Sequence, residues 1–389
     1  MSGGKYALIG GDIVTPERII TGGKILLESG RIKNILEGSS GLPGNDYEML
    51  DCASKIVMPG FIDVHTHGGS GYDFTDNTPE TFSELSQYYY RHGVTTLLAT
   101  LSPLPHSLLV PAVGRLAKYC IENQGETNII GIHLEGPYIN KSMSGGNQEK
   151  YIEIPNYKEW RRVCEEGRGW IHLMTVAPEL PGIIPIVDDA IKNGIVISIG
   201  HSDADGEMMA QMIEKGVSQV THIFNSMPKL HHREDGILAE TFLSDKIDAQ
   251  LIADGIHVHP QIIRIAIRLK TCDHIILITD STRATEIGDG EYVSAGKNVI
   301  VMNGVVRSED GTLAGSTLVM EKALKLIKEV ARVDLPAGSR MTSFNAACSL
   351  GIEKETGSLE EGKRADIVVL DEKLNVKMTI HAGVIKYRA

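Results

Sequence analysis

Three features are scarce in this chain, and each scarcity excludes a class of protein. The five cysteines among 389 residues are scattered and form no C-x-x-C pair, which argues against a disulfide framework and a thiolate metal site. No stretch approaches about 18 apolar residues, so we expect no membrane span, no signal peptide and a cytoplasmic protein. Positive charge is also scarce: the formal net charge of -12 disfavours nucleic acid and anionic membranes as partners.

Strand-length apolar runs and helical patterns alternate through the middle of the chain. The expected strands are 56–64, 94–99, 129–134, 170–176, 195–199, 218–224, 248–252 and 274–279. The expected helices are 79–92, 107–121, 157–166, 183–192, 203–215, 237–246, 261–269 and 316–331. This alternation predicts an α/β fold of the (β/α)8 TIM-barrel type. A doubly wound open sheet is the alternative, disfavoured because no G-x-G-x-x-G follows a strand.

Both ends of the chain show short strands with glycine-rich turns. Neither end has enough apolar residues for a core of its own, so 1–57 and 355–389 are expected to pair into one small β-sandwich domain. The barrel domain then spans 58–354. Within it, residues 285–315 are predicted to form a β insertion that leaves the catalytic face of the barrel.

Polar side chains follow the predicted barrel strands where an active site of this fold is built, at the carboxyl ends. They are His65, His67, Glu135, His201, His222, Asp254, His257 and Asp280. A single histidine in such a place is more often structural than a ligand. Four histidines and one glutamate at the same rim are hard to explain by packing. We interpret His65, His67, Glu135, His201 and His222 as metal ligands.

The spacing of His65 and His67 has a physical reason. Side chains two residues apart on a strand point to the same face, so both imidazoles can reach one ion. Imidazoles and a carboxylate without thiolates suit zinc, iron, manganese or cobalt, and sequence does not select among these divalent metals. A one-ion site using Glu135, His201 and His222 is the alternative to a two-ion site, which the intact H-x-H favours.

Asp280 is the candidate catalytic acid and base. A bound metal ion lowers the pKa of water to about 7, and a carboxylate beside it can take the remaining proton and deliver it to a leaving amine. The alternative for a Thr-Asp-Ser sequence is an aspartate that caps the following segment. The four histidines favour the catalytic role.

At these residues the chain resembles a known family. Residues 59–68 (PGFIDVHTHG) are similar to the first-strand signature of the amidohydrolase superfamily. Residues 133–138 (HLEGPY), 221–227 (THIFNSM), 252–258 (IADGIHV) and 313–316 (LAGS) together resemble the N-acetylglucosamine-6-phosphate deacetylases, and 362–368 (GKRADIV) extends the resemblance into the terminal domain. The order of these motifs is more specific than any one of them.

The resemblance implies a barrel with a terminal β-sandwich, usually as a homodimer, that removes the acetyl group of N-acetylglucosamine 6-phosphate in amino-sugar catabolism. It implies the five metal ligands above and Asp280 as proton acceptor and donor. The implied substrate contacts are Gly146, Asn147, Asn225, Ser226, Arg233, Asp254, His257, Ala314, Gly315 and Ser316. Arg233 is expected to meet the sugar phosphate from the neighbouring subunit, which with His257 supplies local positive charge.

The chain departs from the family pattern in loops that face the substrate. Asn147 stands where the family usually has a histidine that polarises the acetyl carbonyl; asparagine can donate a hydrogen bond there but carries no charge. The segment 233–236 (REDG) replaces a frequent arginine-glutamate-proline-glycine. N-acetylgalactosamine 6-phosphate is therefore an alternative substrate.

Two rival functions remain at this point. Dihydroorotase- or hydantoinase-like ring opening typically uses a carboxylated lysine at the end of strand four, whereas residues 174–179 (MTVAPE) contain no lysine. A metal-holding sugar-phosphate binding protein without catalysis is the other rival. The presence of Asp280 argues against it.

Overall fold

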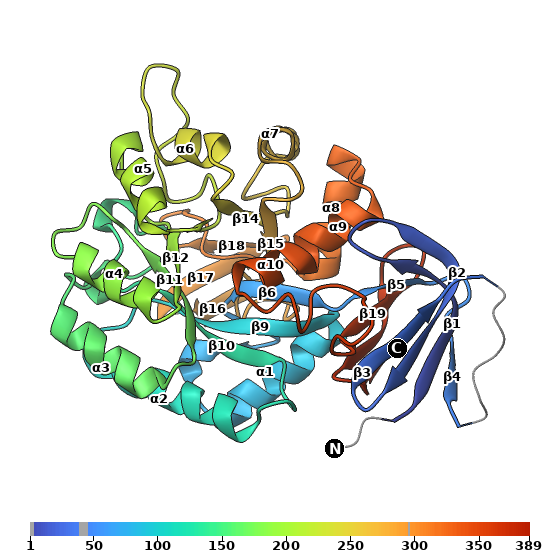
Figure 1. Ribbon diagram of the computed structural model, residues 1–389. Coiled ribbons are helices and arrows are strands. Elements are labelled where there is room, and N and C mark those ends of the chain that lie inside the picture. The colour runs from blue at the N-terminus through green and yellow to red at the C-terminus, as the bar shows by residue number, and fades with distance from the viewer. Residues whose placement is uncertain (1–3, 39–45, 295) are drawn as a thin grey trace.

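Two large sheets organise residues 4–38, 46–294 and 296–389, which the computed structural model describes. Figure 1 shows a barrel surrounded by helices, and beside it a second sheet that contains strands from both ends of the chain. Both sheets have eight strands. The predicted α/β barrel with a separate β unit built from both termini is confirmed.

The barrel strands are parallel, and their order along the sheet follows their order in the chain from β6 to β15. Their bounds are β6 (Phe61–Thr66), β9 (Val94–Leu101), β10 (Ile129–Glu135), β11 (Ile171–Val176), β12 (Val196–Ile199), β13 (Gln219–Val220), β14 (Asp248–Ile252) and β15 (Ile275–Ile278). The two end strands meet at the rim, where the backbone N–H of Asp280 donates to the carbonyl oxygen of His65 at 2.9 Å. The carboxyl ends of all eight strands therefore surround one nearly closed rim.

Helices follow the barrel strands and cover the outside of the barrel (Figure 1). They are α1 (Pro79–Arg91), α2 (His106–Glu122), α3 (Tyr157–Gly167), α4 (Ile184–Lys192), α5 (Gly206–Lys215), α6 (Ile237–Leu243), α7 (Pro260–Lys270) and α8 (Met320–Ala331). Helix α1 shows the local reasons. Thr78 caps it, Pro79 occupies its first position, and the buried Phe82, Leu85 and Tyr89 recur at helical spacing on its inner face.

The first predicted strand is two strands that belong to different sheets. The sequence predicts one strand over 56–64, whereas β5 (Ile56–Pro59) pairs with the terminal sheet and β6 enters the barrel. The two separate at Gly60, where a Cβ atom would lie 2.1 Å from Oγ1 of Thr95. The N–H of Gly60 donates to the carbonyl oxygen of Asp366 at 2.9 Å. Glycine is required here because another backbone and side chain approach too closely for any larger residue.

The sixth barrel strand is shorter than predicted. The sequence predicts a strand over 218–224, whereas β13 ends at Val220. His222 and Phe224 have left-handed φ angles of 27° and 77°, which are incompatible with a continued ladder. The chain turns at this point and brings His222 over the rim.

The terminal sheet has a small core of its own. Its strands are β1 (Tyr6–Val14), β2 (Ile19–Glu28), β3 (Arg31–Leu36), β4 (Glu48–Asp51), β5, β19 (Ile367–Leu370), β20 (Val376–His381) and β21 (Val384–Arg388). Ile13, Ile25 and Val369 are buried together between them. Arg364 joins this unit to the barrel, because its Nη2 donates to Oγ1 of Thr96 at 3.0 Å.

A three-stranded antiparallel sheet occupies the predicted insertion. Its strands are β16 (Gly290–Ser294), β17 (Lys297–Met302) and β18 (Val305–Ser308). The sequence predicts the last two but not β16, an edge strand whose residues are mostly exposed or half-buried. Val299, Val301 and Val306 form a separate small core with Ala284. The insertion is thus a folded unit attached to the rim.

Shorter elements complete the described chain. They are β7 (Gly68–Gly69), β8 (Tyr72–Asp73), the 3-10 turns Phe74–Asp76, Lys141–Met143 and Glu149–Tyr151, α9 (Leu335–Ser339), the π-helical turn Arg340–Phe344 and α10 (Asn345–Ser349). The last two lie against the amino-terminal ends of the barrel strands, where Nδ2 of Asn345 donates to the carbonyl oxygen of Ile275 at 2.7 Å. Among the described residues, no helix combines the length and the apolar character needed to cross a bilayer.

Candidate metal centre and active site

Glu135, His201 and His222 form the first cluster of potential ligands. Glu135 is the last residue of β10, and the two histidines follow β12 and β13 on adjoining loops. Nε2 of His201 lies 3.1 Å from Oε1 of Glu135, and Nε2 of His222 lies 3.3 Å from the same oxygen. All three residues are buried. Their donor atoms are close enough to share one metal ion.

The donor atoms of this cluster fit a cation better than they fit one another. The Nε2 atoms of His201 and His222 lie 3.1 Å apart, and both face Oε1 of Glu135. A single proton can join only one pair of these three atoms, whereas one cation can accept a lone pair from each. Two imidazoles and a carboxylate also leave coordination positions open, as in catalytic zinc sites.

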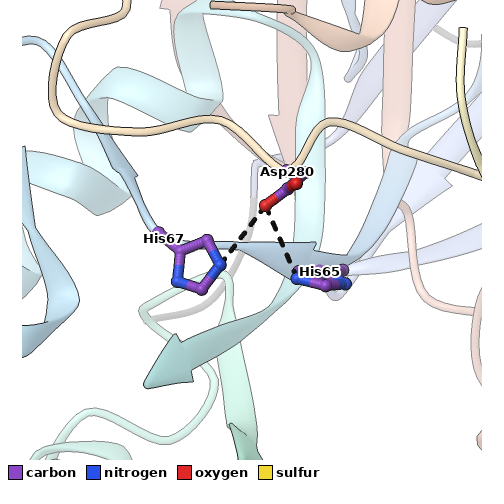
Figure 2. Close-up of side chains that lie close together, drawn as sticks. All are labelled: His65, His67 and Asp280. Carbon is purple, nitrogen blue, oxygen red and sulfur yellow. Dashed lines mark ion pairs between the residues drawn. The ribbon is translucent and has the colours of Figure 1, made fainter. Parts of the chain in front are cut away.

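His65, His67 and Asp280 form the second cluster. Figure 2 shows the aspartate between the two imidazole rings, with its Oδ1 facing both. This oxygen lies 3.5 Å from Nε2 of His65 and 3.3 Å from Nε2 of His67. Glu135 adjoins this cluster too, with Oε1 at 3.3 Å from His65 and Oε2 at 3.4 Å from His67. Glu135 therefore lies between the two clusters, in the position of a bridging carboxylate.

The electrostatics of the rim keep both carboxylates ionised. Burial by itself raises the pKa of Glu135, but His65 and His201 hold it well below its usual range. Burial also raises the pKa of Asp280, and His65 and His67 lower it below its usual value. The pKa of His67 is raised well above its ordinary value, since Asp280 and Glu135 outweigh the effect of burial. Two buried anions among imidazoles form a site that attracts positive charge.

Three residues of the rim adopt left-handed backbone conformations. The φ angles are 49° at His201, 27° at His222 and 48° at Asp280. A non-glycine residue in this region costs about 1–3 kcal/mol and is retained where the surroundings fix it. Such positions cluster at functional sites, and here they turn three side chains toward the same point.

The rings of His201 and His67 are among those oriented through their second nitrogen. Nδ1 of His201 donates to the carbonyl oxygen of Met143 at 2.7 Å, and Nδ1 of His67 is 3.1 Å from Oγ of Ser102. A partner at Nδ1 fixes the ring and leaves Nε2 toward the ion, as is usual around metal sites. Ser102 directly follows β9, but serine is too common after strands to be singled out from the sequence.

A cavity of about 300 Å³ opens above both clusters. Seven of the predicted substrate residues line it: Gly146, Asn147, Asn225, Ser226, His257, Ala314 and Gly315. Seven further lining residues are not predicted from the sequence: Ser102, Gly145, Thr282, Ser294, Val299, Thr312 and Leu313. Four of these seven belong to the predicted insertion, so that unit forms one wall of the cavity. Its inward positions are not recognisable from sequence, because its strands are short and their alternation is weak.

Three predicted substrate residues do not line this cavity. Asp254 lies behind it and accepts a hydrogen bond from Nδ1 of His257 at 2.7 Å. Ser316 is buried and its Oγ donates to the carbonyl oxygen of Thr279 at 2.6 Å. Arg233 is on an exposed loop, where its Nε donates to Nε2 of His232 at 2.9 Å. Within one chain, Asp254 and Ser316 thus bond to neighbouring protein groups, and Arg233 is exposed and does not belong to the cavity lining.

Comparisons with known proteins agree on one family. The model of the amidohydrolase family matches residues 56–386. The N-acetylglucosamine-6-phosphate deacetylase of Bacillus subtilis (strain 168) is 32% identical over 383 residues, 96% of this chain and 95% of the relative. The N-acetylgalactosamine-6-phosphate deacetylase of Escherichia coli O157:H7 is 32% identical over 83% of this chain and 86% of the relative.

A solved structure extends the likeness to three dimensions. It is a mutant of the N-acetyl-D-glucosamine-6-phosphate deacetylase of Mycobacterium smegmatis in complex with N-acetyl-D-glucosamine 6-phosphate. Its TM-score to this chain is 0.92 at 29% sequence identity, and the match covers 99% of this chain and 100% of that one. The likeness therefore includes the terminal sheet as well as the barrel.

Proposed function

Because this chain belongs to the amidohydrolase family, whose members hydrolyse amide and related bonds, we propose that it converts N-acetylglucosamine 6-phosphate to glucosamine 6-phosphate and acetate. The observation that carries the proposal is the pair of ligand clusters joined at Glu135 on the floor of the cavity. The relative from Bacillus subtilis, which matches almost the whole chain, is named for the same activity. The compartment we propose is the cytoplasm, in keeping with five unpaired cysteines.

The ligands of the proposed site are His65, His67, Glu135, His201 and His222. One or two divalent ions (zinc, iron, manganese or cobalt) suit this set of imidazoles and one carboxylate. A bound ion would polarise the acetamido carbonyl. It would also lower the pKa of a water molecule, which could then lose a proton and attack that carbonyl.

Asp280 supplies the proton transfers of the proposed reaction. Its carboxylate is buried, ionised and directed toward both histidines of its cluster. It accepts the proton of the attacking water and then delivers that proton to the nitrogen of the leaving amine. Asn147 lines the same cavity and donates a hydrogen bond to the carbonyl oxygen as negative charge develops there.

The sugar phosphate needs more positive charge than one chain places in its own cavity. Among the described residues that line it, none is a lysine or an arginine. Burial lowers the pKa of His257, but Asp254 raises it above the ordinary value, so this histidine is more easily protonated than a free imidazole. We propose that Arg233 of a second subunit completes the phosphate site in a homodimer. The exposed position of Arg233 supports this arrangement.

An assay of acetate release tests the proposed reaction. Metal-loaded protein is offered N-acetylglucosamine and N-acetylgalactosamine, each with and without a 6-phosphate group. We expect turnover of the phosphorylated glucosamine derivative to be the fastest. Faster turnover of the phosphorylated galactosamine derivative would instead indicate the activity for which the relative from Escherichia coli is named. Binding of the phosphosugar without acetate release would support a non-catalytic binding protein instead.

Mixing two inactive variants tests the contribution of the second subunit. In a dimer of one Arg233→Ala chain and one Asp280→Asn chain, one site keeps the native aspartate and receives the native arginine from across the interface. Random mixing is then expected to restore activity to about a quarter of the native value, as for any two-fold symmetric dimer with one intact site in each mixed pair. If Arg233 acted within its own chain, or if the protein were a monomer, mixing would restore nothing.

A further inference from the structure

A chain of polar side chains runs through the barrel interior from the second cluster to α10. Nδ1 of His65 donates to Oε1 of Gln250 at 3.0 Å. Nε2 of Gln250 donates to Oε1 of Gln219 at 2.7 Å, and Nε2 of Gln219 donates to Oγ of Ser349 at 2.6 Å. We name Gln250, Gln219 and Ser349 the amide relay.

The relay lies in the barrel interior, where buried polar side chains are unusual. Gln219 on β13 and Gln250 on β14 are fully buried, with exposed fractions of 0%. The interior of such a barrel is usually filled by branched apolar side chains. A buried amide is costly unless it is hydrogen-bonded, so a pair of them is retained only where each satisfies the other. Here each amide is satisfied by the next group of the relay.

The relay has one direction, and this direction decides the state of His65. Both carboxamides point their oxygen toward His65 and their NH2 group toward Ser349. Because Oε1 of Gln250 can only accept, Nδ1 of His65 must carry the proton. The proton is therefore absent from Nε2 in the neutral ring, and the lone pair of Nε2 is available.

A second observation points from the same ring to an ion. Nε2 of His65 is buried and has no hydrogen-bond partner among the residues that the structure describes. It lies 3.3 Å from Oε1 of Glu135 and 3.5 Å from Oδ1 of Asp280. An uncompensated ring nitrogen beside two carboxylates is the arrangement expected of a ligand whose free lone pair is directed at a cation.

We propose that Gln250, held by Gln219 and Ser349, is a positioning residue that fixes the tautomer and orientation of His65 and thereby sets the affinity of the second cluster for a divalent ion. The inference rests on the proposed metal-dependent function. It predicts a selective effect, because His201 of the first cluster is oriented by the main-chain carbonyl of Met143 rather than by a glutamine side chain.

Substitution of Gln250 separates this role from simple filling of the barrel. Gln250→Leu keeps a similar volume but removes the acceptor for Nδ1 of His65. Gln250→Glu keeps an acceptor for Nδ1 of His65 but loses the NH2 group that donates to Gln219. Gln219 can then turn its amide, so that its NH2 faces the new carboxylate and its oxygen accepts from the hydroxyl of Ser349, which can donate as well as accept. Gln219→Leu leaves Oε1 of Gln250 as the acceptor for His65 but removes the hydrogen bond that orients the Gln250 carboxamide.

The readout is the affinity of metal-free protein for the first and second equivalents of Zn²⁺ or Co²⁺, measured by competition with a chromophoric chelator. For Gln250→Leu we expect one of the two affinities to fall about 10- to 100-fold while the other is unchanged. Gln250→Glu is expected to return the weakened affinity to near the native value. Gln219→Leu is expected to have a smaller effect on the same ion.

Ser198→Ala is the matched control for loss of a buried polar group. Its hydroxyl is fully buried and bonds to Oγ1 of Thr221 at 2.6 Å rather than to a ring of either cluster. We expect native affinity for both ions in this variant. Circular dichroism of the metal-free proteins verifies that each variant is folded, and if Gln250→Leu is not, Gln219→Leu and Gln250→Glu still decide.

Four results would overturn the inference. Folded Gln250→Leu protein with both native affinities would show that the relay only fills the barrel. Equal weakening of both ions, or failure of Gln250→Glu to restore the lost affinity, would show a general structural effect. If the native protein binds a single ion, the two-ion proposal and this inference fail together. If it binds two and the variants do not discriminate between them, only the relay fails.

Discussion

The two ligand clusters share Glu135 but are held in place by different parts of the chain. In the first cluster, His201 and His222 are on loops with left-handed backbone, and His201 is oriented by the carbonyl of Met143. In the second cluster, His65 belongs to β6 and His67 follows it directly, and side chains orient both rings. The first cluster thus depends on loop conformation, while the second depends on individual neighbouring side chains.

The loops of the first cluster are fixed by Glu179, which follows β11. Its carboxylate accepts hydrogen bonds from Nδ2 of Asn140 at 2.8 Å, from Oγ of Ser202 at 2.7 Å and from the N–H of Asp203 at 2.7 Å. The N–H of Asn140 in turn donates to the carbonyl oxygen of His201 at 2.8 Å. One carboxylate therefore joins three loops around one ligand, in contrast to the one-to-one partners of the second cluster.

The largest expected effect comes from the member of the second cluster with a chemical role. Asp280→Asn removes a proton acceptor but keeps the shape of the side chain, so we expect kcat for acetate release to fall about 10³-fold. Metal analysis of the same sample is expected to show that the first cluster keeps its ion. A kcat near the native value would contradict the role of Asp280, and loss of all metal would remove the distinction between the clusters.

Removal of the carboxylate that joins the loops tests the first cluster. Glu179→Ala leaves three donors without their charged partner, so we expect the free energy of unfolding to fall by about 2–3 kcal/mol. Affinity for the ion of the first cluster is expected to fall about 10- to 100-fold. Denaturant unfolding and chelator competition measure the two effects. Weaker affinity for the ion of the second cluster, with unchanged affinity for the ion of the first, would contradict the assignment of Glu179 to the first cluster.

Ser102→Ala is the corresponding test of the second cluster. It removes the partner of Nδ1 of His67 without disturbing a loop, so we expect a loss of about 10-fold in affinity for one ion. The free energy of unfolding is expected to change by no more than about 1 kcal/mol, the usual value of one hydrogen bond. Equal weakening of both ions in the chelator competition would argue against separate support of the clusters.

A further expected effect concerns a histidine outside both clusters. His92 is buried between Glu286 and Glu321, at 3.2 Å and 2.9 Å, and although burial lowers its pKa these carboxylates raise it from 6.5 to about 9. Because the folded-state pKa is raised, this stabilisation is complete below about pH 6.5 and is lost as pH rises through 9. Its full value is expected to be about 2 kcal/mol, since Glu286 is partly exposed to solvent.

Denaturant unfolding of metal-free protein between pH 6 and pH 10 measures this contribution separately from the clusters. We expect the free energy of unfolding of the native protein to fall across the upper half of this range. For His92→Gln we expect a lower free energy of unfolding at low pH and a smaller change with pH. The same pH dependence in both proteins would show that another group is responsible.

The meeting of these side chains at one rim can be predicted from sequence for a geometric reason. In a parallel barrel every strand delivers its carboxyl end to the same rim, so polar residues after separate strands meet there. Glu135, His201 and His222 are thus placed together although they follow three different strands. The same rule reaches Asp280 after the eighth strand.

Other features depend on contacts that a sequence pattern does not carry. The change of sheet at Gly60 follows from the close approach of the Thr95 side chain, a contact that neither periodicity nor composition reveals. Gln219 and Gln250 lie within predicted strands, but barrel strands are buried on both faces, so periodicity cannot tell an inward glutamine from an outward one. The wall formed by the insertion is likewise visible only in three dimensions.

Stepwise return of metal to chelator-treated protein tests the central claim most directly. Acetate release from N-acetylglucosamine 6-phosphate is followed as Zn²⁺ or Mn²⁺ is added in known amounts. We expect no release without metal, and a rate that rises with added ion and reaches its maximum at one or two ions per chain. Release at the full rate from metal-free protein, or saturation with metal without any release, would contradict the account.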